Sequence, residues 1–154
     1  MIIENFKKYI IDYSDKVKFN SKDIIKGDVF IALQGNKIDG SLFIKDALKN
    51  GAKYVVAEKR ILNLKDERII VVDDVLVFLH LLAKKKRKKF KGKVIGITGS
   101  IGKTSLKECL KFFLEPNFSI SASIKSYNNF LGVILSLLNL DLNSDFGIFE
   151  LGTN

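Results

Sequence analysis

The feature that most constrains the fold is an apolar run that leads directly into a glycine-rich turn. Residues 94–105 read V-I-G-I-T-G-S-I-G-K-T-S, and the apolar part predicts a buried parallel strand. Beyond the turn, apolar residues recur at the spacing of one helix face, at Leu106, Cys109, Leu110 and Phe113, and Pro116 predicts the end of that helix. A strand, a glycine turn and a helix in this order favour an α/β fold with a parallel sheet.

The turn has the composition of a phosphate-binding loop. Such a loop wraps backbone N–H groups around phosphates, places a lysine on the β- and γ-phosphates and offers a hydroxyl to Mg²⁺, while the following helix adds the positive end of its dipole. The common spacing has a glycine where this chain has Ile97. A chance glycine turn between a strand and a helix remains the alternative. The candidate phosphate-binding residues are Gly99, Ser100, Ile101, Gly102, Lys103, Thr104 and Ser105.

Composition is that of a globular protein. The 154 residues, 47% of them hydrophobic, suffice for one ordinary domain or two small ones. Charged residues interrupt residues 1–13, so we expect no signal peptide there, and the longest apolar stretch, residues 75–83, is too short to span a bilayer. The single cysteine, Cys109, is expected to be a buried small hydrophobe. We expect a cytoplasmic protein.

Basic residues are concentrated in one segment. The net charge is +9, yet residues 84–93 hold eight of the 26 basic residues and no acid, which leaves the remainder at +1. Only three basic residues are arginines, whereas base readout and phosphate forks favour arginine. The segment is interpreted as a solvated linker or helix end, with a phosphate-attracting or nucleic-acid-binding surface as the alternative.

Strands and helices alternate on both sides of this segment. The patterns before it predict strands at 29–33, 54–57 and 69–72, a helix at 42–48, and a helix at 75–83 that Asp74 caps and that carries His80 in its packed core. After it, the patterns predict strands at 94–97, 118–122 and 146–151 and a second helix at 131–138. We therefore expect an α/β domain at 1–83, a basic linker at 84–93 and the first part of a phosphate-loop domain at 94–154. A nucleotide-binding sheet normally needs about five strands, so we expect the strands after residue 94 to form only part of such a sheet.

Three segments together resemble the Mur ligases, the ATP-dependent enzymes that add amino acids to the peptidoglycan precursor. They are T-G-S-I-G-K-T-S, whose glycines depart from the general pattern as that family's do; Y-N-N-F-L-G-V at 127–133; and F-E-L-G-T-N at 149–154. The last resembles the glutamate-bearing strand end of the MurF branch. The sibling MurE branch usually has serines after this glutamate, and remains an alternative.

The amino-terminal segment resembles the domain with which this family holds its UDP-sugar. The resemblance covers F-N-S-K-D-I-I-K-G-D-V-F-I-A-L-Q-G-N-K-I-D-G-S-L-F and implies that Ser21, Lys22 and Asp39 contact the substrate. Lys22 stands where an arginine is usual, and Ser41 where a histidine is common. Lysine keeps the charge but loses the bidentate fork. Turn chemistry alone is the alternative role for Asp39.

The resemblance implies a carboxylate–amine ligase with ATP and Mg²⁺ as cofactors. In the MurF branch, ATP phosphorylates the terminal carboxylate of UDP-N-acetylmuramoyl-tripeptide, and the amine of D-alanyl-D-alanine attacks the acyl phosphate. Lys103 would neutralise phosphate charge, Thr104 would place one Mg²⁺, and Glu150 would help to hold a second. Asn128 and Asn129 would contact substrate, with a turn as their alternative. Lys103 and Glu150 are thus the candidate catalytic residues.

The family's site also uses a histidine shortly after the glutamate strand, a carbamylated lysine and a third domain, all beyond residue 154. We therefore expect a monomer with little or no ligase activity on its own, no nucleic-acid partner and no membrane span. The alternative from another class is a non-catalytic module that binds a UDP-sugar or nucleotide. Binding of each ligand separately distinguishes the two.

Overall fold

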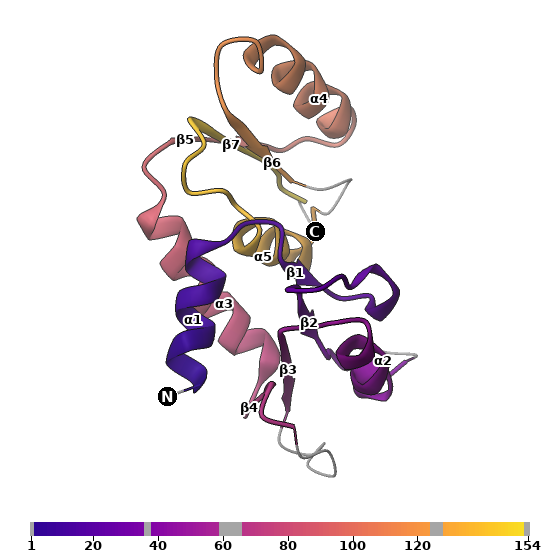
Figure 1. The fold of residues 1–154 in the computed structure, drawn as a ribbon. Helices are drawn as coiled ribbons and strands as arrows, with labels where there is room; N and C mark the ends of the chain where they lie inside the picture. The colour runs from indigo at the N-terminus through magenta and orange to yellow at the C-terminus, as the bar shows by residue number, and fades with distance from the viewer. Residues whose placement is uncertain (1, 36–37, 59–65, 124–127, 153–154) are drawn as a thin grey trace. The chain divides into compact units, whose positions relative to one another are not determined.

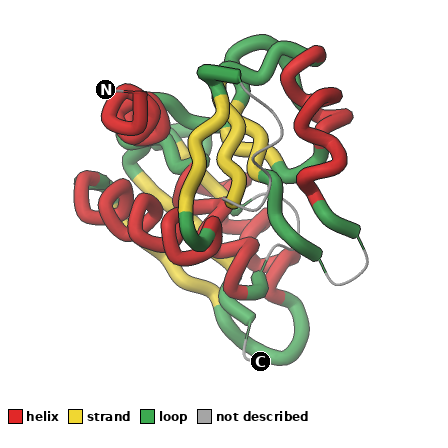
Figure 2. The backbone as a smooth tube through the Cα atoms, turned by 90° about the horizontal axis from the view of Figure 1, so that it is seen from below, coloured by secondary structure: helices red, strands yellow, loops and turns green. Residues whose placement is uncertain are grey.

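The chain forms two compact α/β units. The computed structural model describes residues 2–35, 38–58, 66–123 and 128–152. The first unit comprises Met1–Ile10 and Lys16–Leu81, and the second comprises Ile11–Asp15 and Leu82–Asn154. Figure 2 shows the alternation of strands and helices along the chain. Each unit is built on a parallel sheet, which confirms the predicted α/β class.

The first unit contains a sheet of four parallel strands in sequence order. They are β1 (Val17–Lys18), β2 (Val29–Ile31), β3 (Tyr54–Glu58) and β4 (Ile69–Val72). Val29 pairs with Tyr54 and Val55 pairs with Ile69, so the register runs evenly across the centre of the sheet. The centre of this sheet is buried on both faces, as the continuous apolar runs of β2 and β3 predict.

Helices cover both faces of the first sheet. The helical elements in order are α1 (Ile2–Asp12), η1 (Ser21–Asp23), η2 (Gly40–Phe43), α2 (Ile44–Lys49) and α3 (Val75–Lys89). Ile44 and Ala47 of α2 join a core with Phe30 and Val55 on one face. On the other face, the ring of Phe6 lies 5.4 Å from that of Tyr54 and 5.9 Å from that of Phe78, between centroids. The backbone N–H of Val77 donates to Asp74 Oδ1 at 2.8 Å, which confirms the predicted cap of α3.

The second unit contains a sheet of three parallel strands in the order β5-β7-β6. Its elements are β5 (Lys93–Ile97), α4 (Lys103–Leu114), β6 (Ile120–Ala122), α5 (Phe130–Leu138) and β7 (Phe146–Glu150). The last strand in sequence is therefore the central one, and its pairing with both neighbours puts Glu150 beside Ile97 at the carboxyl end. Among the described residues β5 is an edge strand and partly exposed, so the prediction of a buried strand at 94–97 is wrong except at Ile97.

Helices α4 and α5 lie on opposite faces of the second sheet (Figure 1). Successive side chains of a strand point to opposite faces. Phe149 accordingly packs with Phe90 and Leu140 on the α5 side, whereas Glu150 points to the α4 side. An apolar core thus covers the face of β7 that is turned to α5. The face turned to α4 carries the charged carboxylate of Glu150 at the end of the strand.

Helix α4 turns a different face to the sheet from the one its apolar pattern predicts. Leu106 and Phe113 are exposed, and so is Cys109, so the expectation of a buried cysteine is wrong. The buried residue is Lys107, one turn after Lys103. His80 is also exposed rather than packed in the core. None of the helices in the described parts of the chain is both long and apolar enough to cross a membrane.

The basic segment begins as a helix. Helix α3 continues to Lys89, because lysine favours helices and because cations at a helix C-terminus offset its dipole. The change from one unit to the other falls within this helix, between Leu81 and Leu82. Lys86 is fully buried; its Nζ donates at 2.7 Å to the carbonyl oxygens of Tyr13 and of Leu138. One of the eight basic residues is therefore not solvated.

Candidate functional site

The glycine-rich turn between β5 and α4 has a backbone that requires glycine at two positions. Gly99 has φ +136° and Gly102 has φ +81°, and side chains of L-amino acids rarely adopt such angles. Gly102 is the N-cap of α4, so this left-handed residue stands directly before the first turn of the helix. The positive φ angles of Gly99 and Gly102 therefore explain why the motif has glycine at these two positions.

Lys103 is the first residue of α4, and its ammonium group lies over the loop. Its Nζ donates a hydrogen bond to the carbonyl oxygen of Gly99. The first N–H groups of a helix have no acceptor one turn earlier, and they carry the positive end of the helix dipole. Lys103, Thr104 and Ser105 supply such groups. The structure thus gathers backbone donors and one ammonium group at a single loop, the arrangement that binds phosphate.

The sheet brings Glu150 to the same place from 46 residues further along the chain. Thr104 Oγ1 donates to Glu150 Oε2 at 3.0 Å, and the Glu150 side chain is fully buried. The metal roles expected separately for Thr104 and Glu150 thus fall on two atoms in contact, which can share one ion.

Lys107 is the residue of this site that the sequence analysis missed. It is 1% exposed, and its Nζ lies 3.1 Å from Glu150 Oε1 and 3.2 Å from Glu108 Oε1. Its Nζ also donates to the carbonyl oxygen of Ser123 at 2.9 Å. The available signal was its position four residues after Lys103, which puts both lysines on one face of a helix. A lysine that is buried against the sheet, as Lys107 is, needs a buried acid as its partner.

One oxygen of Glu150 remains without a hydrogen bond. Oε1 contacts the Lys107 ammonium at ion-pair distance but accepts no hydrogen bond of good geometry. The backbone N–H of Glu150 donates to Ser123 Oγ at 3.3 Å, which holds the strand end in place. The other oxygen, Oε2, belongs to the same fully buried carboxylate and faces the Thr104 hydroxyl, and a carboxylate oxygen beside a hydroxyl offers the hard oxygen ligands that Mg²⁺ prefers. The residues present therefore fit the metal ion that the sequence predicts.

The described residues do not supply a complete metal cage. Within them, no group of three or more His, Cys, Asp or Glu residues could hold a metal ion. Magnesium is usually bound through one or two carboxylates and completes its octahedral shell with water and substrate phosphates. A single carboxylate and a hydroxyl beside a phosphate loop match that pattern.

Of the two asparagines predicted to contact substrate, Asn128 lies at this end of the sheet. Its carbonyl oxygen accepts from the N–H of Gly152 at 2.6 Å, and a Cβ on Gly152 would lie 2.7 Å from that oxygen. Asn129 instead caps α5, because its Oδ1 accepts from the N–H of Gly132 at 2.8 Å. Tyr127, Thr153 and Asn154 of the quoted motifs lie outside the described residues.

The candidate substrate residues of the first unit occupy two short 3₁₀ helices that both pack against α2. Ser21 is buried, and its carbonyl oxygen accepts from the Asn50 side chain at 2.9 Å, whereas Lys22 is exposed. Asp39 Oδ1 accepts from the N–H of Ser41 at 2.9 Å and so begins the second of these helices. Asp39 thus has the turn role that the sequence left open, and Lys22 is available to solvent.

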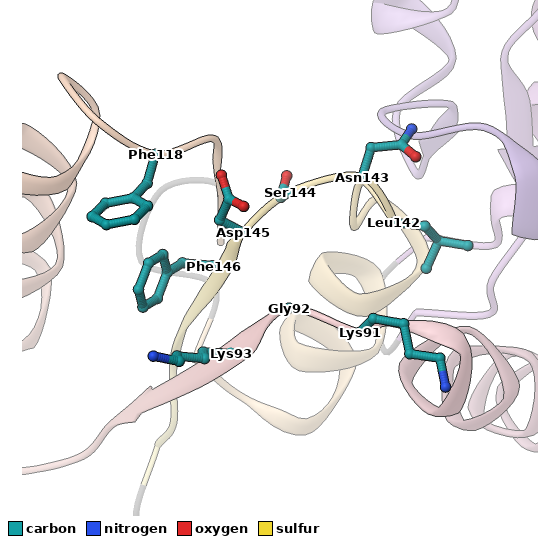
Figure 3. Close-up of a pocket in the computed structure, with 9 residues that line it drawn as sticks. All are labelled: Lys91, Gly92, Lys93, Phe118, Leu142, Asn143, Ser144, Asp145 and Phe146. Carbon is teal, nitrogen blue, oxygen red and sulfur yellow. The ribbon is translucent and has the colours of Figure 1, made fainter.

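A cavity of about 470 Å³ lies at the opposite end of the second sheet (Figure 3). The rings of Phe118 and Phe146 form one wall, with centroids 5.2 Å apart, and Lys91 and Leu142 lie at the other end. Phe146 begins β7 and Glu150 ends it, so this cavity is separated from the phosphate loop by the length of the strand. It takes no part in the site described above.

Two family models match most of the chain. Residues 15–87 match the Mur ligase family, catalytic domain, and residues 97–154 match the Mur ligase middle domain. Their boundary falls in the basic segment and β5. The second match contains the phosphate loop, Lys107 and Glu150. All the residues of the site described above therefore lie in the part of the chain that matches the Mur ligase middle domain.

Individual relatives agree with these matches. The chain is 46% identical over 141 residues to the UDP-N-acetylmuramoyl-tripeptide–D-alanyl-D-alanine ligase of Rickettsia prowazekii, which covers 91% of this chain and 31% of the relative. It is 38% identical over 141 residues to the ligase of the same name from Buchnera aphidicola, covering 91% and 30%.

A solved structure shows the same fold. The MurF ligase of Thermotoga maritima in complex with ADP matches with a TM-score of 0.74 and 34% identity, over 93% of this chain and 33% of that one. The chain thus spans about a third of the length of the relatives it matches. With its phosphate loop, its buried strand-end glutamate and these matches, the chain belongs to the Mur ligase family and is of the MurF type.

Proposed function

We propose that the second unit binds the phosphates of ATP with one Mg²⁺ for a carboxylate–amine ligase. The observation that carries this proposal is the contact of Thr104 with Glu150 at the start of α4, directly beside Lys103. The loop N–H groups from Gly99 to Ser105 cradle the phosphates, and Lys103 neutralises their charge. Mg²⁺, when bound, polarises the phosphates and offsets the negative charge that develops on them.

The names of the relatives support one particular reaction. We infer that the intact ligase joins D-alanyl-D-alanine to UDP-N-acetylmuramoyl-tripeptide in the cytoplasm, as part of peptidoglycan precursor synthesis, through an acyl phosphate. Phosphoryl transfer and attack by an amine leave little covalent chemistry to the protein, so positioning and electrostatics supply most of the rate. In this chain Lys103 and Glu150 do that work, and Asn128 faces the substrate from the same sheet end.

The first unit holds the UDP-sugar in this proposal. Ser21, Lys22 and Asp39 lie on elements that share α2 as a support, which places their loops on one side of the sheet. Lys22 is exposed and offers a charge to an anionic ligand, without the bidentate fork of arginine. Asp39 shapes its loop through its cap, and Gly40 allows the close approach of that loop to Leu33.

Nucleotide binding tests the proposal. The 154-residue chain is titrated calorimetrically with ADP in the presence of Mg²⁺, alongside Lys103→Met and Lys111→Met. We expect the Lys103 variant to lose about 30-fold or more in affinity, because a phosphate-bound ammonium makes charge-assisted hydrogen bonds. Lys111 lies two turns further along α4 in an exposed pair with Glu115, so its variant serves as the matched control. Equal affinity in all three proteins would contradict the phosphate site.

A binding module without catalysis is the second candidate, and the exposed charge of Lys22 in the first unit is the observation that favours it. Separate titration with the UDP-sugar substrate isolates this function. We expect little turnover when the chain is mixed with UDP-N-acetylmuramoyl-tripeptide, ATP and D-alanyl-D-alanine. Robust release of phosphate that depends on all three substrates would show that the module description is too narrow.

A further inference from the structure

The two oxygens of the Glu150 carboxylate have different surroundings. Oε2 faces the hydroxyl of Thr104 at 3.0 Å, on the side of the phosphate loop. Oε1 faces the Lys107 ammonium at 3.1 Å. The carboxylate is fully buried, so its orientation is set by these two neighbours and by the strand that carries it. One oxygen points to the loop, and a fixed positive charge stands beside the other.

The Lys107 ammonium is held in its place. Its Nζ donates to the carbonyl oxygen of Ser123, on the loop after β6, at 2.9 Å, and Glu108 contributes a second carboxylate at 3.2 Å. Because the side chain is 1% exposed, it cannot swing into solvent without opening the packing between α4 and the sheet. A metal ion that took both oxygens of Glu150 would have to displace this group or lie against it.

The number of available oxygens matters for the choice of metal ion. Ca²⁺ takes six to eight ligands at 2.3–2.6 Å and often binds a carboxylate through both oxygens, whereas Mg²⁺ takes six in an octahedron and uses one oxygen of a carboxylate. Both ions form complexes with nucleotide phosphates. A carboxylate with only one oxygen free therefore suits Mg²⁺ and penalises Ca²⁺.

We propose that Lys107 restricts Glu150 to one metal-binding oxygen and thereby makes the site select Mg²⁺ over Ca²⁺. This makes Lys107 a positioning residue that acts through Glu150. The proposal rests on the proposed function, since it concerns the ion that accompanies the nucleotide. It adds to it a role for a buried lysine that phosphate contact does not explain.

The experiment measures the affinity of the chain for ADP in Mg²⁺ and in Ca²⁺ by calorimetry, and takes the ratio of the two dissociation constants. For the unmodified chain we expect the dissociation constant for ADP to be about tenfold lower in Mg²⁺ than in Ca²⁺, because octahedral Mg²⁺ needs only one oxygen of the Glu150 carboxylate. Lys107→Met and Lys107→Gln free Oε1 and should bring the ratio to about threefold or less. Lys107→Arg, which keeps a cation at Oε1, and the exposed control Lys111→Met should preserve it.

The outcomes separate the two proposals. Absence of ADP binding by the unmodified chain with either ion would overturn the proposed function itself. Binding with equal support from both ions, or a ratio unchanged in Lys107→Met and Lys107→Gln, would overturn the selectivity proposal alone. Circular dichroism verifies the fold of each variant. Unfolding of every Lys107 variant, Lys107→Arg included, would assign this lysine to stability and likewise overturn its selective role.

Discussion

The two parallel sheets of this protein are closed in different ways. In the first unit, apolar side chains of β2 and β3 meet apolar side chains of helices on both faces. In the second unit, the central strand β7 has an apolar core on the α5 face, and on the α4 face it ends in Glu150 with Lys107 and Thr104 against it. The first sheet is thus packed against apolar side chains on both faces, whereas the second sheet has one apolar face and one face with a buried ion pair.

This difference indicates that the two faces of β7 have separate roles, one in stability and one in the site. A buried ion pair is weak evidence for stability, because the cost of removing two charges from water offsets much of their attraction. Its loss is nevertheless costly, since the remaining charge has no partner. The apolar face of β7 therefore fixes the strand, and the polar face fixes the orientation of one carboxylate.

The largest effect is expected from removing that carboxylate. Glu150→Ala should destabilise the second unit by about 3–5 kcal/mol, because it leaves the buried Lys107 ammonium without its fully buried partner. Native-state hydrogen exchange of the β7 amides reports this unit separately from the first.

A double variant sharpens the same comparison. Glu150→Gln combined with Lys107→Met removes both charges and should regain most of the lost stability, although not nucleotide binding. Equal loss of stability in Glu150→Ala and in the double variant would mean that the ion pair of Lys107 with Glu150 does not organise the polar face.

The second effect concerns Lys86, which is also buried in the described part of the second unit. Burial lowers the pKa of Lys86 to about 8, while the nearby carboxylates of Asp15, Asp141 and Asp12 act in the opposite direction. Below about pH 8 both the folded and the unfolded chain hold this proton, and the folded state bears the cost of a buried charge. Between about pH 8 and 10.5 only the unfolded chain holds it, so stability should rise with pH.

The expected gain is about 3 kcal/mol across this window, from the difference between the folded and unfolded pKa. Urea unfolding of the unmodified chain and of Lys86→Met, measured from pH 7 to 10.5, isolates it, because groups common to both proteins cancel in the difference. A difference in stability that stays flat, or falls, over this range would contradict the assignment.

The fold was largely predictable and the packing of the site was not. Strands at 54–57, 69–72 and 146–151 and the cap at Asp74 follow from short-range patterns, which the structure matches closely. The orientation of α4 could not be inferred from its apolar residues, because the sheet-facing side is set by Lys107 and its distant partner Glu150. Pairing between charges far apart in the sequence produces no periodic pattern. The spacing of Leu106, Cys109 and Phe113 therefore predicted as sheet-facing a side of α4 that is exposed.

A smaller effect distinguishes the two roles of Asn129. As the cap of α5 it should contribute about 1 kcal/mol, so Asn129→Ala lowers stability by that amount, whereas Asn129→Ser keeps the cap and remains close to the unmodified chain. If the amide also contacts substrate, the serine variant binds the tripeptide nucleotide more weakly at unchanged stability. Equal loss of stability in both variants would contradict the capping role.

The smallest effect tests the exposed side of α4 against its buried side. The Phe113 side chain is 69% exposed, so Phe113→Ala should change stability by less than about 0.5 kcal/mol, as for other surface substitutions. Had the apolar pattern of α4 faced the sheet, the same change would cost about 3–5 kcal/mol. Urea unfolding of this variant beside Phe149→Ala, whose ring packs with Phe90 and Leu140, makes the comparison within one unit. A similar large loss in both would mean that α4 buries its phenylalanines, and the Lys107 contact with Glu150 would then need another explanation.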